Sequence, residues 1–69
     1  MYHIDINKLN GKIVERQMTK EGLAKCIGID RSTLFRRIRN NKLLVVDLQR
    51  ICEVLCLSSE EATDIFLAK

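Results

Sequence analysis

The 69-residue sequence has no proline, no tryptophan and only three glycines, and aromatic residues make up 4% of it. Without proline, helix ends have to be set by polar caps and by the few glycines. No apolar run approaches the ~20 residues of a membrane span, and the N-terminus lacks the pattern of a secretion signal. We therefore expect a single cytoplasmic domain with no membrane partner.

Groups suited to catalysis are also scarce. The single histidine is His3, next to an N-terminus that is expected to be frayed and unpacked. No two carboxylates fall on a predicted buried face, and no glycine-rich loop of the phosphate-binding kind is present. A chain of this size has little room for a substrate pocket. We expect no enzymatic activity, no cofactor and no small-molecule ligand.

Cysteine is rare and odd in number. Cys26, Cys52 and Cys56 stand within apolar patterns, as small hydrophobic residues do in a reducing compartment. A metal site is the alternative, since Cys52 and Cys56 are one helical turn apart and Cys26 and His3 are possible further ligands. Structural zinc sites usually carry cysteine pairs at shorter spacings in loops. We therefore expect core packing and no metal.

Apolar residues recur at helical spacing along the whole chain, which predicts an all-α fold. Five helices are expected, at about residues 5–16, 19–27, 31–39, 46–56 and from 58 onward. Thr19, Asp30 and Ser58 stand where side chains cap helices, and Glu61 completes a capping box with Ser58. The fourth helix has no such cap, so its start is the least defined boundary.

The ends of the second and third helices have their own signals. Gly28 can adopt the left-handed conformation of a sharp C-terminal turn, and Asn40 and Asn41 tolerate that region better than most residues. The residues expected to face the core of this compact five-helix bundle are Ile6, Leu9, Ile13, Val14, Leu23, Ala24, Ile27, Leu34, Ile38, Leu48, Ile51, Cys52, Leu55, Ala62, Ile65 and Phe66.

Charge is distributed unevenly along the chain. The formal net charge is +3, but residues 20–42 hold seven basic and two acidic residues, whereas residues 43–69 hold two basic and five acidic ones. A domain polarised in this way can turn one surface toward a polyanion and keep the other side away from it. A charge run on a solvated face is the alternative at this point.

The second and third helices are joined by only three residues, 28–30. Two helices with so short a connection have to cross steeply, and the small side chain of Ala24 allows the close approach. Ile29 in the turn can fill the space beneath the crossing. The third helix, residues 31–39, then turns outward a face with four arginines and no acidic residue of its own. This excess of cations favours nucleic acid as the partner.

Ala24, Gly28, Ile29, Leu34 and Ile38 together match the helix-turn-helix of phage repressors and Cro proteins. The sequence therefore resembles the Cro/CI-type family, whose fold is the lambda-repressor-like bundle, and in particular the small regulators in prophages of Gram-positive bacteria. This resemblance extends over nearly the whole chain, because residues 48–57 and 58–66 look like the fourth and fifth helices of that family.

One residue departs from the family pattern. Gly22 occupies a position where such helices usually carry a better helix former, which bears on the rigidity of the second helix.

The resemblance implies a role for particular side chains, with residues 31–39 as the recognition helix. The residues expected to contact base edges are Arg31, Ser32, Phe35 and Arg36. Those expected to contact phosphate are Lys20, Thr33, Arg37, Arg39, Asn40 and Lys42. Phe35 is equally compatible with a contact to a thymine methyl group and with packing on the core.

The expected function is sequence-specific binding of an operator in double-stranded DNA by a repressor-like regulator of transcription, which would be associated with the nucleoid when bound. A single domain contacts few base pairs, so a homodimer on DNA is expected, with Ile65 and Leu67 of the last helix at its interface. The alternative is a docking module or antirepressor that uses the same fold and the exposed side of the last helix to bind a protein.

Overall fold

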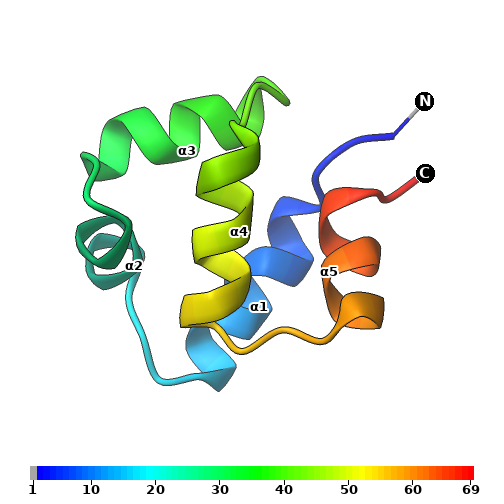
Figure 1. Ribbon diagram of the computed structural model, residues 1–69, viewed down its shortest axis with the longest axis horizontal. Coiled ribbons are helices and arrows are strands. Elements are labelled where there is room, and N and C mark those ends of the chain that lie inside the picture. The colour runs from blue at the N-terminus through cyan, green and yellow to red at the C-terminus, as the bar shows by residue number, and fades with distance from the viewer. Residues whose placement is uncertain (1) are drawn as a thin grey trace.

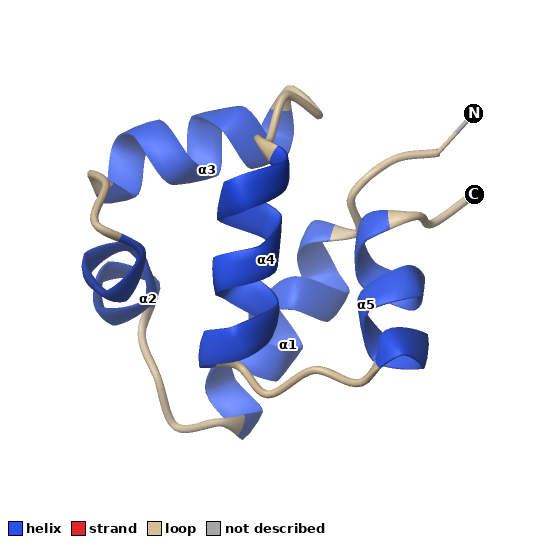
Figure 2. Cartoon of the chain, viewed as in Figure 1, coloured by secondary structure: helices blue, strands red, loops and turns tan. Residues whose placement is uncertain are grey.

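The computed structural model describes residues 2–69, and within them it contains α-helices and no β-strand. The helices are α1 (Ile6–Glu15), α2 (Lys20–Ile27), α3 (Arg31–Arg39), α4 (Val45–Val54) and α5 (Ser59–Phe66). In Figure 1, α3 lies across one end of the molecule, α2 and α5 lie on opposite sides of α4, and α1 passes behind α4. Figure 2 shows that the connections between them are short loops. The prediction of a five-helix, all-α domain is confirmed.

Polar side chains begin four of the five helices. Asp5 accepts a hydrogen bond from the backbone of Lys8, and Thr19 accepts one from Gly22. The carboxylate of Asp30 accepts from two backbone N–H groups of the first turn of α3, and Ser58 forms the predicted capping box at α5. Helix α4 follows Leu44 and has no side-chain cap. It begins at Val45, one residue earlier than predicted, and ends at Val54, two residues earlier than predicted.

Helices α1 to α4 all end in the same way. In each, a residue in the left-handed region follows the last turn, and the next backbone N–H donates to the carbonyl five residues earlier, which satisfies carbonyls that the helix leaves unpaired. The left-handed residues are Gln17, Gly28, Asn41 and Cys56. Only one of them is glycine, which explains why the ends of α1 and α4 had no clear signal in the sequence.

The core is formed by residues from all five helices: Leu9, Ile13, Leu23, Ala24, Ile27, Leu34, Ile38, Ile51, Leu55, Ile65 and Phe66. Burial was predicted wrongly for three residues. Val14 is 73% exposed, because it follows Ile13 by one residue and so points about 100° away from it on the helix. Cys26 and Cys56 are also exposed, so that only Cys52 packs against the core.

The N-terminal segment is anchored, contrary to the prediction of a frayed end at His3. The backbone of His3 pairs with Ala68 in both directions, at 2.8 and 3.0 Å, and the N–H of Asp5 donates to Ile65. The side chain of Asn41 adds two further bonds, accepting from the backbone of Ile4 and donating to the carbonyl of Tyr2. The chain ends therefore lie together beside α5 (Figure 1).

Helices α1 and α5 are also joined by charged side chains. The ammonium of Lys12 pairs with the carboxylates of Glu61 and Glu15, and a guanidinium nitrogen of Arg16 lies 3.9 Å from Glu61. The hydrogen bond from Lys12, together with the cap interaction with Ser58, lowers the pKa of Glu61 to about 2. Conversely, the two carboxylates raise the pKa of Lys12. This cluster lies on the α1–α5 side of the molecule, away from α3.

None of the helices between Tyr2 and Lys69 is both long and apolar enough to cross a membrane.

Candidate nucleic-acid interface

The corner between α2 and α3 holds α3 in place. Gly28 ends α2 with φ 89°, and Asp30 caps α3 two residues later. Leu34 and Ile38 bury one side of α3 in the core, and Ile29 packs against that core from the turn, as predicted. A further support comes from Arg50 of α4, whose guanidinium donates to the carbonyl of Ile27 at the end of α2. The corner is thus tied to the body of the molecule on two sides.

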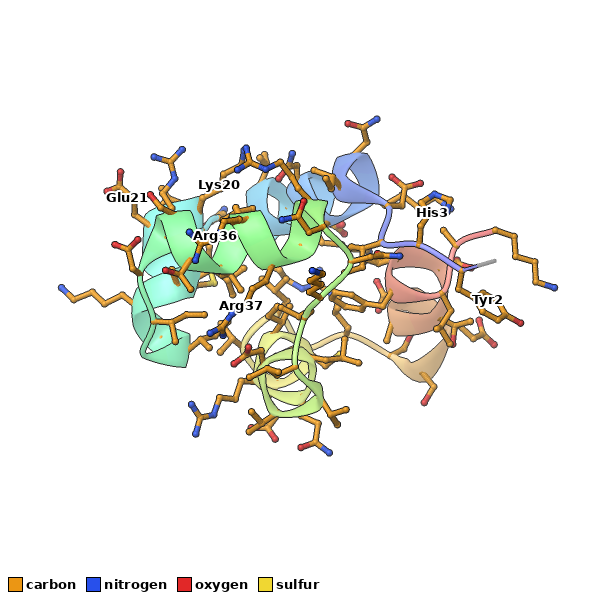
Figure 3. All side chains as sticks on the ribbon, turned by 90° about the horizontal axis from the view of Figure 1, so that it is seen from above. Tyr2, His3, Lys20, Glu21, Arg36 and Arg37 are labelled. Carbon is orange, nitrogen blue, oxygen red and sulfur yellow. The ribbon has the colours of Figure 1, made fainter. Side chains whose placement is uncertain are left out.

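The opposite side of α3 is exposed and basic. Arg31, Ser32, Arg36 and Arg39 are all exposed. Figure 3, viewed from above α3, shows the labelled Arg36 over this helix. Neither Arg36 nor Arg39 forms a salt bridge with any described residue. Four predicted contact residues therefore share one accessible surface, with two of the cations free to meet a polyanion.

Phe35 lies between this surface and the core. It is partly buried and packs against the core cluster, and the ammonium of Lys20 lies 5.3 Å from the centre of its ring. This cation–π contact holds the first residue of α2 beside α3. A shallow hollow between the two helices is lined by Lys20, Arg31, Ser32, Phe35 and Arg39. Three cations thus converge on one hollow.

Two of the four arginines have an acidic partner on another helix, which the sequence reasoning did not anticipate. Arg31 lies 3.7 Å from Glu21 of α2, and both side chains are more than half exposed, so that water and salt weaken this pair. The second pair is much less exposed. A terminal nitrogen of Arg37 donates to the carboxylate of Asp47 on α4 at 3.0 Å, and the side chain of Asp47 is only 5% exposed.

The remaining predicted phosphate contacts lie at both ends of α3. Thr33 is half-buried in the first turn, where its N–H donates to Asp30. Asn40 ends the helix and is exposed, as is Lys42 in the following turn. The backbone N–H of Lys42 donates to the carbonyl of Arg37, which fixes the path of the turn. The contact roles of all these residues stay predictions.

Asp47 and Arg50 are structural members of the site that sequence reasoning missed. Asp47 had a signal, because it precedes the buried Ile51 by four residues and therefore lies on the same side of α4. An acidic residue on a buried helix face needs a cationic partner, but the sequence does not say which arginine supplies it. Arg50 had no such signal, since its partner is a backbone carbonyl.

The four groups considered as metal ligands do not come together. Among residues 2–69, no three side chains of histidine, cysteine, aspartate or glutamate are grouped as a metal site would require. Cys26 lies on α2, Cys56 follows α4, and His3 pairs with the C-terminal segment.

Comparison with known proteins decides the family. The model of the Cro/C1-type HTH DNA-binding domain matches residues 8–64, which include all five helices except the first two residues of α1 and the last two of α5. The chain belongs to this family. No curated protein and no solved structure gives a significant match. As a Cro/C1-type domain the chain is a DNA-binding regulator of transcription.

Proposed function

We propose that this Cro/C1-type domain binds an operator in double-stranded DNA as a homodimer and acts as a repressor of the phage or prophage kind. The observation that carries the proposal is the exposed basic side of α3, where Arg36 and Arg39 have no acidic partner in the described chain. An α-helix fits the major groove of B-DNA, and arginine can donate two hydrogen bonds to guanine there.

In this proposal α3 enters the groove with its first turns. Arg31, Ser32 and Arg36 reach base edges, and the partly buried Phe35, which lines the hollow beside them, contacts a thymine methyl group. The residues that contact phosphate are Lys20, Thr33, Arg39, Asn40 and Lys42. Lys20 is well placed for this role because it begins α2, where the helix N-terminus favours an anion.

Of the two residues expected at a dimer interface, only Leu67 is exposed. Ile65 is only 1% exposed and belongs to the core, so it is not available to a partner. Leu67, which is 51% exposed, lies with Val45 in the lining of a shallow hollow that Tyr2 also borders. Leu44 and Val46 are exposed nearby on the α4 side. We propose this apolar surface as the contact between two copies, since two half-sites supply the specificity that one domain lacks.

The function is tested by selecting bound duplexes from a genomic library and then measuring their affinity at 50 and 200 mM salt. A specific operator should emerge, and its affinity should fall about 10³-fold or more across this range if the complex makes six or more phosphate contacts. Affinity that is absent or insensitive to salt would favour the alternative, a module that docks on a protein. Sedimentation with and without operator measures the dimer, and Leu67→Asp should abolish it.

A further inference from the structure

Asp47 is the single charged residue that is buried among residues 2–69, with 3% of its surface exposed. Its side chain accepts one hydrogen bond in the described structure, from Arg37 at 3.0 Å. The side chain of Arg37 is itself two-thirds buried, with 33% of it exposed. Figure 3 shows Arg37 on the α4 side of α3, whereas Lys20 and Glu21 lie beyond the other side.

This pair joins two helices that otherwise contact each other little. Both α3 and α4 pack mainly on α2, and the direct α3–α4 contact is smaller than either of these. The pair is formed near the end of α3, where the carbonyl of Arg37 also accepts from Lys42. On the other helix, Asp47 lies in the first turn of α4, where no side chain caps the helix and a negative charge is favoured by the helix dipole.

An arginine in this position has two competing partners when DNA is bound. To reach a phosphate, Arg37 would have to leave a carboxylate that is almost completely buried. Such a charge without its partner is strongly unfavourable, because it has lost its water and the helix dipole offsets only a small part of that loss. A phosphate contact at the exposed surface of a protein–DNA complex gains less than this, since salt and water screen it.

We propose that Asp47 withholds the charge of Arg37 from DNA and makes Arg37 a positioning residue of the recognition helix. The pair fixes the end of α3 on α4, so that the base-reading side chains keep one orientation. At the same time it removes one cation from the set that binds any duplex. Both effects raise the preference for the operator over random DNA. This inference rests on the proposed function.

The experiment compares the wild-type domain with Asp47→Asn, Arg37→Met and the double variant that carries both changes. Glu53→Gln is the matched control, because it removes one exposed negative charge from the same helix without freeing an arginine. Each protein is titrated with a random duplex and with the selected operator between 50 and 200 mM salt, and the slope of log K against log salt is measured for each duplex.

Asp47→Asn should steepen the slope on random DNA by about 0.9, the value of one added phosphate contact, which is a further loss of about 3.5-fold in affinity between 50 and 200 mM salt. It should also lower the ratio of operator to random affinity. Arg37→Met and the double variant should leave the wild-type slope unchanged. Glu53→Gln should change neither slope nor ratio.

Three results would overturn the inference: a slope for Asp47→Asn equal to that of Glu53→Gln, an unchanged operator preference in Asp47→Asn, or a slope about one unit shallower in Arg37→Met. The double variant decides the question if a single variant does not fold, because it leaves no unpaired buried charge and exchanging both partners of such a pair is often tolerated. Its slope equals that of the wild type if Arg37 is withheld, and is about one unit shallower if Arg37 binds phosphate. Wild-type protein that binds no duplex refutes the proposed function instead.

Discussion

At the scale of single residues, the base contact proposed for Arg36 can be tested directly. It is exposed on α3 and has no salt bridge within the described chain. Arg36→Ala should relax the base preference at one operator position, at a cost of ~1–3 kcal/mol on the preferred sequence. Competition binding against a set of single-base operator variants measures this. Equal weakening on every duplex would assign Arg36 to phosphate instead.

A substitution of Lys42, in contrast, should affect binding to every duplex equally. Its side chain is exposed in the turn after α3 and forms no salt bridge with a described residue. Lys42→Gln should weaken all duplexes alike and make the salt slope shallower by about one unit. Lys69→Gln is the matched control, because Lys69 lies over the ring of Tyr2 near the chain ends. A loss confined to the operator would contradict a phosphate role for Lys42.

Most of the individual contacts could not be predicted from the sequence. The exposure of Arg36 follows from helical spacing against Leu34 and Ile38, and that prediction holds. The partner of Arg37 did not follow, because periodicity places a residue on a face of its own helix and says nothing about which other helix meets that face. Val14 illustrates the same limit, as its neighbour Ile13 takes the core position.

At the scale of helices, the left-handed residue after each of the first four helices controls local stability. Gly28 has φ 89°, and a β-carbon there would meet no atom within 4 Å. Gly28→Ala should therefore destabilise the domain through backbone strain alone, by about 1 kcal/mol. Gln17 has φ 58° after α1, so Gln17→Gly should stabilise it by a similar amount. Thermal denaturation measures both, as shifts of roughly 4–8 °C in opposite directions. Melting temperatures that shift in the same direction in both variants would refute the idea that the left-handed residue has the same effect after each helix.

Asn41 combines a left-handed backbone with two long-range bonds. Its φ is 57°, and its amide bonds to the backbone of both Tyr2 and Ile4. Asn41→Ala should cost about 1–2 kcal/mol, since strain and two lost hydrogen bonds add. Asn41→Gly removes the strain and keeps the loss of the bonds, so it should cost less. Hydrogen exchange at the N–H of Ile4 should accelerate in both variants, and a protected N–H would show that the contact is dispensable.

Helix ends with side-chain caps were the best-predicted elements. Thr19, Asp30 and Ser58 cap their helices as expected, because these interactions are local in sequence. The end of α4 was placed two residues too late, since Cys56 gives no sign that it adopts the left-handed region. Gly22 departs from the family pattern, and the structure gives a local reason for the glycine. A β-carbon at this position would lie only 3.2 Å from the hydroxyl of the cap residue Thr19.

At the scale of the whole molecule, the charged cluster between α1 and α5 makes stability depend on pH. The pKa of Glu61 is about 2, below its ordinary value of 4.5. The ionised carboxylate therefore stabilises the fold above pH 4.5, and this contribution is lost as the pH falls toward 2. Glu61→Gln should lower the melting temperature at pH 7 and have little effect near pH 2. Glu60→Gln, at an exposed neighbouring position, is the control. A constant difference across this range would contradict the assignment.

The overall architecture was the most predictable level, whereas assembly was the least. Five helices and the basic, exposed side of α3 follow from apolar spacing, caps and charge. The surface that two copies would share does not, because it depends on which apolar residues remain outside the core. Ile65 and Leu67 stand two residues apart, yet one is buried and the other is half exposed.

The backbone pairing of His3 with Ala68 also matters for protein engineering. Since His3 and Ala68 lie side by side, a short peptide can join the two terminal segments into a ring, and new ends can be opened in the loop between α4 and α5 (Figure 1). Such a circular permutant would keep α2, α3 and the corner between them on one uninterrupted stretch of chain. It offers a way to fuse a reporter at a different edge of the molecule without touching the helix-turn-helix.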